Sequence, residues 1–347
     1  MEKVTINDIA RLTGLSKGTV DRVLHNRGEV SRKSYEKVMA VIQELGYQPN
    51  LYASLLAQAK QRTIALLLPS HEPGSYWELA SAGIAQSAPD LKPLSIQPLQ
   101  FTYDEYSADS FRATCARVLE AAPDGVVIAP MFPYETQAFT RELQARGIPF
   151  VFVDTKLEKT GYLAYFGIPA YKSGYLCADI LTGGEPVREV LIVRILRDKQ
   201  RQSDPTVERR AGFTDYMLEH NPSCTIRHLF IDPSDPAATD DALDAFFKEF
   251  PSVRHIVVFN SRIHLIVPYL QRHPVAGRRV VGFDNLGANL AALRRGTVSM
   301  LIAQHPDDQV RQAIQALSER IVFQRTPDRT DNFMHMDILT RYNIEDY

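Results

Sequence analysis

Apolar runs that alternate with amphipathic stretches constrain the fold of this chain more than any other feature. From Thr63 onward, short apolar segments recur, and stretches such as 111–122 and 134–147 between them have the spacing of amphipathic helices. The strand candidates are IALLLP (64–69), GVVIAP (125–130), PFVFVD (149–154), EVLIVRI (189–195), HIVVFN (255–260) and RRVVGFD (278–284), with less regular ones at 91–101 and 225–232. Near-continuous apolar strands alternating with helices predict a parallel sheet covered on both faces. Because the repeat is too long for one sheet, we expect two doubly wound α/β subdomains, which bind ligands outside the carboxyl ends of their strands.

The first 46 residues have a different pattern, which predicts three short helices. Thr5 is placed to cap the first helix, with Asp8 at the spacing of a capping box, and Gly14 suits the left-handed turn that ends it. Ser16 and Ser31 are placed to cap the second and third helices. The apolar positions of the third helix follow a 3.6-residue period: Tyr35, Val38, Met39, Ile42 and Leu45. This arrangement predicts a helix-turn-helix, whose second helix enters the DNA major groove; a plain αα-hairpin is the alternative.

Charge is distributed unevenly between these two regions. Residues 1–62 hold ten Lys or Arg and six Asp or Glu, a net charge of +4, while the whole chain carries −2 and the remainder therefore −6. A basic N-terminal head on an acidic body favours a DNA-binding head joined to a domain with another task.

The same motifs resemble a known family. The stretch TINDIARLTGLSKGTVDRVLHN (5–26), followed by Val30-Ser31 and LGYQPN (45–50), is similar to the N-terminus of LacI/GalR-type bacterial repressors. The body resembles the periplasmic-binding-protein-like effector domain of that family at Pro69-Ser70, RRAGF (209–213), GFDN (282–285) and the AQHP ending at 303–306. The resemblance covers roughly residues 3–340.

The resemblance implies a domain organisation and a function. It implies a DNA-binding head (1–48), a hinge helix or linker (49–61) and an effector domain (62–347), whose N-subdomain spans about 62–167 and 296–328 and whose C-subdomain spans about 168–295 and 329–347. The function it implies is a transcription regulator, most often a repressor, that binds a near-palindromic operator in double-stranded DNA as a homodimer and responds to a small effector. The chain's last residues, RYNIEDY, contain no leucine heptads, so no tetramerising coiled coil is expected.

Three groups of residues are candidates for DNA contact. Lys17, Gly18 and Arg22 occupy the positions at which family members touch base edges, and Arg22 can make a bidentate contact to guanine. The small polar residues that can bond phosphates are Thr5, Ser16, Thr19, Asn26 and Ser31, although helix capping alone also explains several of them. Leu56 falls at the place of the family's minor-groove leucine, with Leu55 beside it as the alternative wedge.

The ligand candidates lie at strand ends of the predicted body. They are Tyr76, Trp77, Arg209, Asn260, Arg262 and Asp284. Aromatic faces, amides, a guanidinium and a carboxylate suit a sugar or sugar derivative, and a purine is the second possibility. Each residue also has a structural alternative, such as Trp77 in the core or Asp284 as a helix cap.

Several other functions find no support in the sequence. No GxGxxG, GxxxxGK[ST], HExxH or GxSxG motif is present, so we expect neither an enzyme nor a cofactor or metal site. The cysteines Cys115, Cys177 and Cys224 are far apart and are expected to be buried small hydrophobes. The absence of a signal peptide and of a membrane-spanning apolar run leads us to expect a cytoplasmic protein. The rival functions are a solute-binding receptor, against which the helix-turn-helix argues, and an α/β enzyme, which lacks a catalytic constellation.

Overall fold

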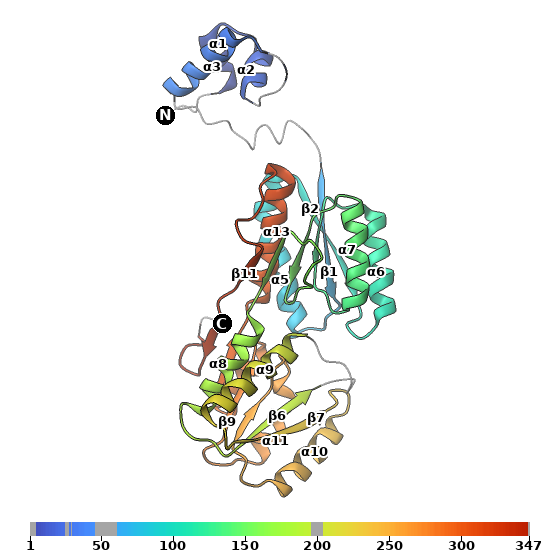
Figure 1. Cartoon of the computed structure of the whole chain (residues 1–347), viewed down its shortest axis with the longest axis vertical. Coiled ribbons are helices and arrows are strands. Elements are labelled where there is room, and N and C mark those ends of the chain that lie inside the picture. The colour runs from blue at the N-terminus through green and yellow to red at the C-terminus, as the bar shows by residue number, and fades with distance from the viewer. Residues whose placement is uncertain (1–4, 25–27, 29, 46–60, 196–203, 346–347) are drawn as a thin grey trace. The chain divides into compact units, whose positions relative to one another are not determined.

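The structure is a computed structural model that describes residues 5–24, 28, 30–45, 61–195 and 204–345. The chain divides into two units, Met1–Lys60 and Gln61–Tyr347, which we call the head and the body (Figure 1). Asn26, Leu55, Leu56 and nearly all of the predicted hinge lie outside the described residues, so the predictions made for them remain predictions.

Three helices build the head, as the sequence predicts. They are α1 (Ile6–Thr13), α2 (Lys17–Leu24) and α3 (Arg32–Leu45). Thr5 and Asp8 form the expected capping box, and Gly14 ends α1 in the left-handed conformation at φ 62°. The hydroxyl of Ser16 accepts the backbone N–H of Thr19 at 3.2 Å, which caps α2. Ser31 caps α3 in the same way, at 3.3 Å from the N–H of Ser34.

The three helices of the head enclose a small hydrophobic core. Ile9, Val20 and Val38 are completely buried, and Val41 and Ile42 are packed partly against them. Tyr35 and Met39, which share the helical period, are 45% and 40% exposed. The predicted helical period is correct, but the buried stripe runs through Val38, Val41 and Ile42, because α1 and α2 cover that side of α3.

The first sheet of the body has six parallel strands in the order β11-β5-β4-β3-β1-β2. The strands are β1 (Arg62–Pro69), β2 (Ile96–Tyr103), β3 (Gly125–Ile128), β4 (Phe150–Val153), β5 (Ala164–Gly167) and β11 (Asp331–Phe333). Its helices are α5 (Tyr76–Leu91), α6 (Ala108–Ala121), α7 (Pro133–Ala145) and α13 (Pro306–Phe323), with a 3₁₀ turn at Lys92–Leu94. In Figure 1, α5 and α13 cover one face of the sheet, while α6 and α7 cover the other. We call this layered unit lobe 1.

The second sheet has the order β12-β10-β9-β8-β6-β7, parallel except for β12. Its strands are β6 (Glu189–Ile195), β7 (Thr225–Ile231), β8 (His255–Val257), β9 (Arg279–Phe283), β10 (Met300–Ala303) and β12 (Asp337–Leu339). Its helices are α8 (Ala170–Thr182), α9 (Asp204–His220), α10 (Pro236–Glu249), α11 (Val267–Arg272) and α12 (Gly287–Arg294), with a 3₁₀ turn at Ile263–Leu265. A core of aliphatic and aromatic side chains joins β6 to α10, α11 and α12. This unit is lobe 2, and the two lobes confirm the predicted pair of doubly wound α/β subdomains.

The chain passes between the lobes three times, after β5, after β10 and after β11. Two of the predicted lobe boundaries are wrong in detail. The sequence places 296–328 in the first subdomain, but β10 pairs with β9 in the second sheet. It places 329–347 in the second subdomain, but β11 pairs with β5 in the first. Both strands are short and lack the long apolar run that marks the strands predicted from the sequence.

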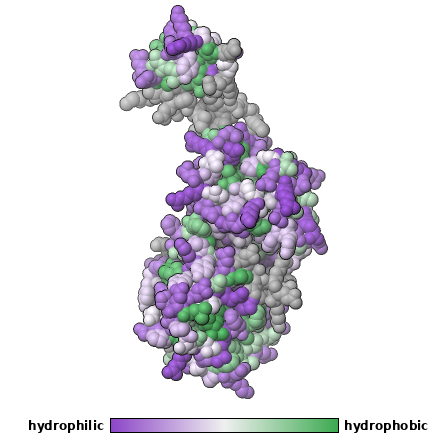
Figure 2. Space-filling view, in the orientation of Figure 1, coloured by the Kyte–Doolittle hydropathy of each residue, from purple (hydrophilic) through white to green (hydrophobic). Residues whose placement is uncertain are grey.

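The surface of the molecule is largely polar on the face drawn in Figure 2, where hydrophobic side chains form only smaller patches. This distribution follows from the burial of the apolar strand positions, several of which are fully covered in both sheets. Among the described residues, no helix has the length and hydropathy needed to cross a bilayer.

Candidate functional site

Two buried aspartates mark equivalent points in the two lobes. Asp154 follows β4 and Asp284 follows β9. Each of these strands is the third of its sheet, counted from β11 in the first sheet and from β12 in the second. Both residues have positive φ angles, 67° and 69°, and both backbone N–H groups donate to the next strand, to Phe166 and Ile302 respectively. A non-glycine residue in this conformation is uncommon and is frequent at functional sites. The internal repeat of the fold therefore places one carboxyl group at the carboxyl end of each sheet.

In lobe 2, Asp284 belongs to a hydrogen-bonded cluster with Arg209 of α9. The side-chain amide of Gln304 donates to both carboxylate oxygens of Asp284 at 2.9 Å, and its oxygen accepts a hydrogen bond from Arg209. Arg209 also donates to the carbonyl of Phe259 at 2.7 Å and lies over the ring of Phe283, 4.3 Å from its centroid. These contacts fix a guanidinium group and a carboxyl group with their orientations locked by packing, as a binding site requires.

Lobe 1 contributes Asp154, which accepts a hydrogen bond from the hydroxyl of Tyr76 at 2.7 Å. Gln309 of α13 links the lobes: its oxygen accepts the N–H of Asp154 at 3.0 Å, and its amide donates to the carbonyl of Gln304 at 2.9 Å. Asp154 and Asp284 are therefore joined through two glutamines, Gln309 and Gln304. We call Tyr76, Asp154, Arg209, Asp284, Gln304 and Gln309 the central cluster.

Burial dominates the electrostatics of the central cluster. It raises the pKa of Asp284 from 3.8 to about 7, against the lowering effect of Arg209 and of the amide hydrogen bonds. It also raises the pKa of Asp154, which Tyr76 and Arg209 partly oppose. The pKa of the Tyr76 hydroxyl lies well above 10 because of burial and of the two nearby carboxyl groups. Carboxyl groups with perturbed pKa values at the ends of parallel strands are typical of functional sites.

Three buried polar atoms in this region have no hydrogen-bond partner among the described residues. They are the Nε of Arg209, the hydroxyl of Ser75 beside Tyr76, and the amide oxygen of Asn285 beside Asp284. Native proteins leave few such atoms unpaired, so each calls for an explanation. A polar ligand that supplies the missing donors and acceptors is the simplest one.

The remaining ligand candidates lie in different surroundings. Trp77 is only 8% exposed and packs edge-on against Tyr76, with ring centroids 5.0 Å apart. Asn260 donates to the carbonyl of Ile195 at 3.0 Å. Arg262 reaches across to lobe 1, where it pairs with Glu105 at 2.8 Å and with the hydroxyl of Tyr106 at 2.6 Å. The structure thus brings Tyr76, Arg209 and Asp284 together. The side chain of Arg262 instead forms an ion pair with Glu105 of the other lobe.

Glycines set the position of Arg209. At Gly212, one turn further along α9, an added Cβ would lie 2.0 Å from the carbonyl oxygen of Tyr171 in α8. At Gly174 of α8, it would lie 1.8 Å from the carbonyl oxygen of Arg209 itself. Only glycine fits such a close backbone approach. The RRAGF motif therefore combines a side chain of the central cluster with the glycine that lets its helix lie against α8.

The sequence did not identify three residues of the cluster. Asp154 had the same signal as Asp284, an acidic residue at the end of an apolar strand, and that signal was sufficient to find it. Gln304 and Gln309 had no such signal, because glutamine is common on surfaces and β10 was not predicted as a strand.

The head places its candidate residues on and around α2. Lys17, Gly18 and Arg22 are at least partly exposed. No described atom lies closer than 3.9 Å to a Cβ added at Gly18, so this part of the helix is open. Thr5, Ser16 and Ser31 cap the three helices, and the hydroxyl of Thr19 lies 2.9 Å from that of Ser16. Capping uses the hydroxyl oxygen as an acceptor, so a phosphate can accept only the hydroxyl proton, and that of Thr5 is already donated to Asp8 at 2.7 Å.

Side chains that could bind a metal ion do not gather in the described residues. No group of three or more His, Cys, Asp or Glu side chains there is arranged to hold a metal ion. Cys115 and Cys177 are buried and Cys224 is half-buried, and burial raises the pKa of the Cys115 thiol to about 12.

Both the head and the body of this chain are similar to known protein families. Residues 64–324 match the family of periplasmic binding protein domains, and residues 5–50 match the bacterial regulatory proteins of the lacI family. The chain is similar to the HTH-type transcriptional regulator AscG of Escherichia coli strain K12, with 22% identity over 81% of this chain and 82% of that protein.

Solved structures also resemble this chain. The crystal structure of a Bacteroides fragilis protein described as a LacI transcriptional regulator is 36% identical, with a TM-score of 0.78, over 83% of this chain and all of that one. A periplasmic solute-binding protein of Actinobacillus succinogenes, solved with bound D-allose, shares the fold, with a TM-score of 0.70 and 18% identity over 83% of this chain and all of that one.

Proposed function

Since the chain belongs to the lacI family of bacterial regulatory proteins, we propose that its head binds an operator and that a small polyhydroxylated effector in its body controls that binding. The protein is a transcriptional regulator; the relatives found are regulators and solute-binding proteins rather than enzymes. A homodimer on a near-palindromic operator is the proposed assembly, since paired heads match paired half-sites. Regulation of this kind takes place where the chromosome lies, so the proposed location is the cytoplasm.

The central cluster is the observation that carries the effector proposal. It offers carboxyl oxygens as acceptors, a guanidinium and amides as donors, and the aromatic side chain of Tyr76. Alternating donors and acceptors at fixed positions suit sugar hydroxyls, each of which donates and accepts. The unpaired atoms of Ser75, Arg209 and Asn285 add further partners. A sugar or sugar derivative is therefore the proposed effector; a purine remains the second candidate, because an aspartate and an arginine beside an aromatic ring also suit a heterocycle.

The connection between the lobes supports a coupling mechanism. Gln309 bridges Asp154 to Gln304, and Arg262 pairs with Glu105, so groups of both lobes already meet around the cluster. A ligand that contacts both carboxyl ends binds one arrangement of the lobes better than another and shifts the population toward it. Linkage then requires the same free energy to appear in operator affinity.

Substitution of Arg22 tests the DNA half of the proposal. Arg22→Ala is expected to weaken specific operator binding by about 1–3 kcal/mol and to relax the preference at one base pair, because an α2 arginine open to solvent can read guanine with two hydrogen bonds. The measurement is fluorescence anisotropy of the full chain on operator DNA and on random DNA. Lys33→Ala is the matched control: it removes an exposed charge from α3 and is expected to weaken both DNAs alike. An equal loss on both DNAs for Arg22→Ala excludes base reading by this residue.

A further inference from the structure

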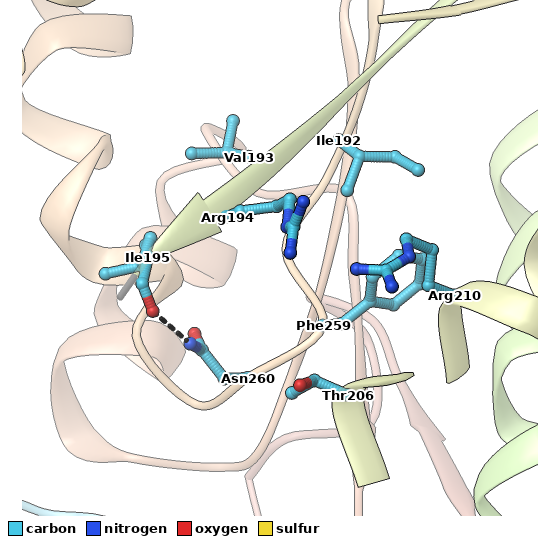
Figure 3. A pocket seen from close by; sticks show the side chains of 8 residues that line it. All are labelled: Ile192, Val193, Arg194, Ile195, Thr206, Arg210, Phe259 and Asn260. Carbon is cyan, nitrogen blue, oxygen red and sulfur yellow. Dashed lines mark hydrogen bonds between the residues drawn. The ribbon is translucent and has the colours of Figure 1, made fainter. Parts of the chain in front are cut away.

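Lobe 2 has a second cavity, at the amino ends of its parallel strands. The hollow drawn in Figure 3 lies at their carboxyl ends and adjoins the central cluster, because Phe259 on its wall accepts a hydrogen bond from Arg209. The second cavity lies at the opposite end of the sheet, where Arg254 and Arg278 directly precede β8 and β9. Its volume is about 320 Å³, within the range of small-molecule sites. We call it the distal cavity, and its walls are Asp244, Phe247, Lys248, Pro251, Arg254, Tyr269, His273, Val275 and Arg278.

Stacked rings fix the shape of the distal cavity. The ring of Tyr269 stacks with those of Phe247 and His273, with centroids 5.9 and 4.5 Å away and interplanar angles of 11° and 21°. The guanidinium group of Arg278 lies 5.2 Å from the centroid of Phe247. The hydroxyl of Tyr269 also donates to the carboxylate of Asp244 at 2.9 Å. These contacts join α10 to α11, so the wall is formed before any ligand binds, which lowers the cost of binding.

The two arginines of the distal cavity form no ion pair with a described carboxylate. Arg278 donates to the carbonyl of His273 at 2.8 Å, and Arg254 donates to that of Pro251 at 2.6 Å, each through Nη1. The Nε of Arg278 is buried and has no hydrogen-bond partner in the described part of the chain. Burial and the charge of Arg254 lower the pKa of Arg278, so the two guanidinium groups are close enough to repel each other. A buried donor without an acceptor, beside a second cation, calls for an anion.

Positive charge exceeds negative charge on the walls of this cavity. Lys248, Arg254 and Arg278 are cationic, and Asp244 is acidic. The carboxylate of Asp244 already accepts the hydroxyl of Tyr269. Lys248 is exposed at the end of α10 and has no hydrogen bond or ion pair with any described residue. A concave surface with excess positive charge raises the local concentration of anions.

We propose that the distal cavity binds the phosphate group of a small metabolite, separately from the effector site. Arg254, Arg278 and Lys248 come from three elements: the segments before β8 and β9, and the end of α10. Donors from three elements surround a tetrahedral oxyanion, whereas a planar carboxylate is satisfied by one guanidinium fork. The apolar side chains of Phe247 and Val275 contact the rest of the molecule. This site goes beyond the proposed function, because it gives the regulator a second small-molecule input that involves neither the head nor the central cluster.

Matched pairs of ligands test the distal cavity. The full-length protein is titrated by calorimetry, at constant ionic strength, with glucose and glucose phosphate and with adenosine and adenosine monophosphate. At least one phosphate ester is expected to bind about ten times more tightly than its parent compound, because only the ester forms charge-assisted hydrogen bonds with the arginines. A gain in both pairs shows that the phosphate alone is recognised. A gain in one pair shows that the cavity also recognises the rest of that molecule.

Substitutions on the walls locate the bound phosphate. Lys248→Glu reverses an exposed charge that bonds no described group, so the fold is expected to remain intact while the affinity for the phosphate ester falls at least about fivefold. Arg278→Lys keeps the charge but loses the guanidinium fork, and it is expected to weaken binding as well. Arg188→Glu is the matched control: Arg188 is exposed just before β6, at the same end of the sheet, but it is not a wall residue. This control is expected to change the affinity by less than about twofold.

The same variants separate the distal cavity from other basic surfaces. The head is identical in all of them, so phosphate that binds to the head gives equal affinities throughout the series. Equal affinities of the parent, Lys248→Glu and Arg278→Lys for every phosphate ester overturn the proposed site. Phosphate esters that bind no more tightly than their parent compounds overturn it too. Either result leaves the proposed control of operator binding by a sugar in the central cluster unaffected.

Discussion

Arg209→Met is expected to lower the free energy of unfolding of the body by about 3 kcal/mol at pH 8, since it leaves buried acceptors without a donor and two nearby carboxyl groups without a cation. Arg209 is 3% exposed and bonds the carbonyl of Phe259 and the side chain of Gln304, and methionine has a similar length but no donor. The variant therefore leaves two acceptors unpaired and removes the cation that favours ionised Asp154 and Asp284.

The loss should depend on pH in a defined direction. Arg209 attracts the carboxyl groups only when they are ionised, and burial raises the pKa of Asp284 to about 7. The difference between the parent and Arg209→Met is therefore expected to be largest above about pH 7 and to shrink toward about pH 5. Urea unfolding followed by the fluorescence of Trp77, the single tryptophan and a residue of the body, measures it. Arg188→Met, an exposed control in lobe 2, is expected to stay within about 0.5 kcal/mol of the parent. A similarly small effect for Arg209→Met would show that the cluster does not depend on its charge.

Asp284→Asn is expected to have the opposite effect on stability while abolishing the response to effector. The carboxyl group has a pKa of about 7 in the folded protein against 3.8 for an ordinary aspartate, so the folded state prefers the protonated form. Because the unfolded chain releases this proton at lower pH, the stability of the parent falls as the pH rises from about 4 to about 7, and it levels off above. Asparagine is neutral at every pH and tolerates the positive φ of 69° at this position. At pH 8 the variant is therefore expected to be more stable by on the order of 2–4 kcal/mol.

Thermal unfolding of both proteins between about pH 4 and pH 8 measures this effect. The melting curves are expected to lie closest together near the acid end, where Asp284 is largely protonated in both states, and to separate as the pH rises. Effector affinity should fall at the same time, because an amide can replace only part of the acceptor capacity of a carboxylate. A variant that is less stable than the parent at pH 8 would contradict the account of Asp284 as a charge kept in the body for binding.

The sequence predicted those features of the fold that are determined by residues close together in the chain. The caps at Thr5, Ser16 and Ser31 were predicted correctly because capping is decided within four residues. The long apolar strands of both sheets were predicted for the same reason. By contrast, β10 and β11 were placed in the wrong lobes, since a strand of three or four residues is assigned by its pairing partner rather than by its own composition.

In the candidate site, too, some residues were identified from local patterns and others were not. Asp284 and Arg209 were identified from strand ends and from a motif, but their mutual arrangement depends on Gln304 and Gln309, which no local pattern distinguishes. Arg262 was predicted to bind ligand, and its contact with Glu105, 157 residues away in sequence, could not be read from either segment. Periodicity and residue spacing do not predict which side chains meet through tertiary contacts between the lobes.

Operator affinity measured with and without effector tests the central claim most directly. The full-length protein is titrated onto labelled operator DNA by fluorescence anisotropy, first alone and then with a saturating sugar found by calorimetry. The account predicts a change in operator affinity of about tenfold or more, within the usual range of allosteric coupling, and the same factor in effector affinity when operator is bound. It also predicts no change for Asp284→Asn. A sugar that binds the parent in the body yet leaves operator affinity unchanged would contradict the claim that the head and the body form one regulatory device.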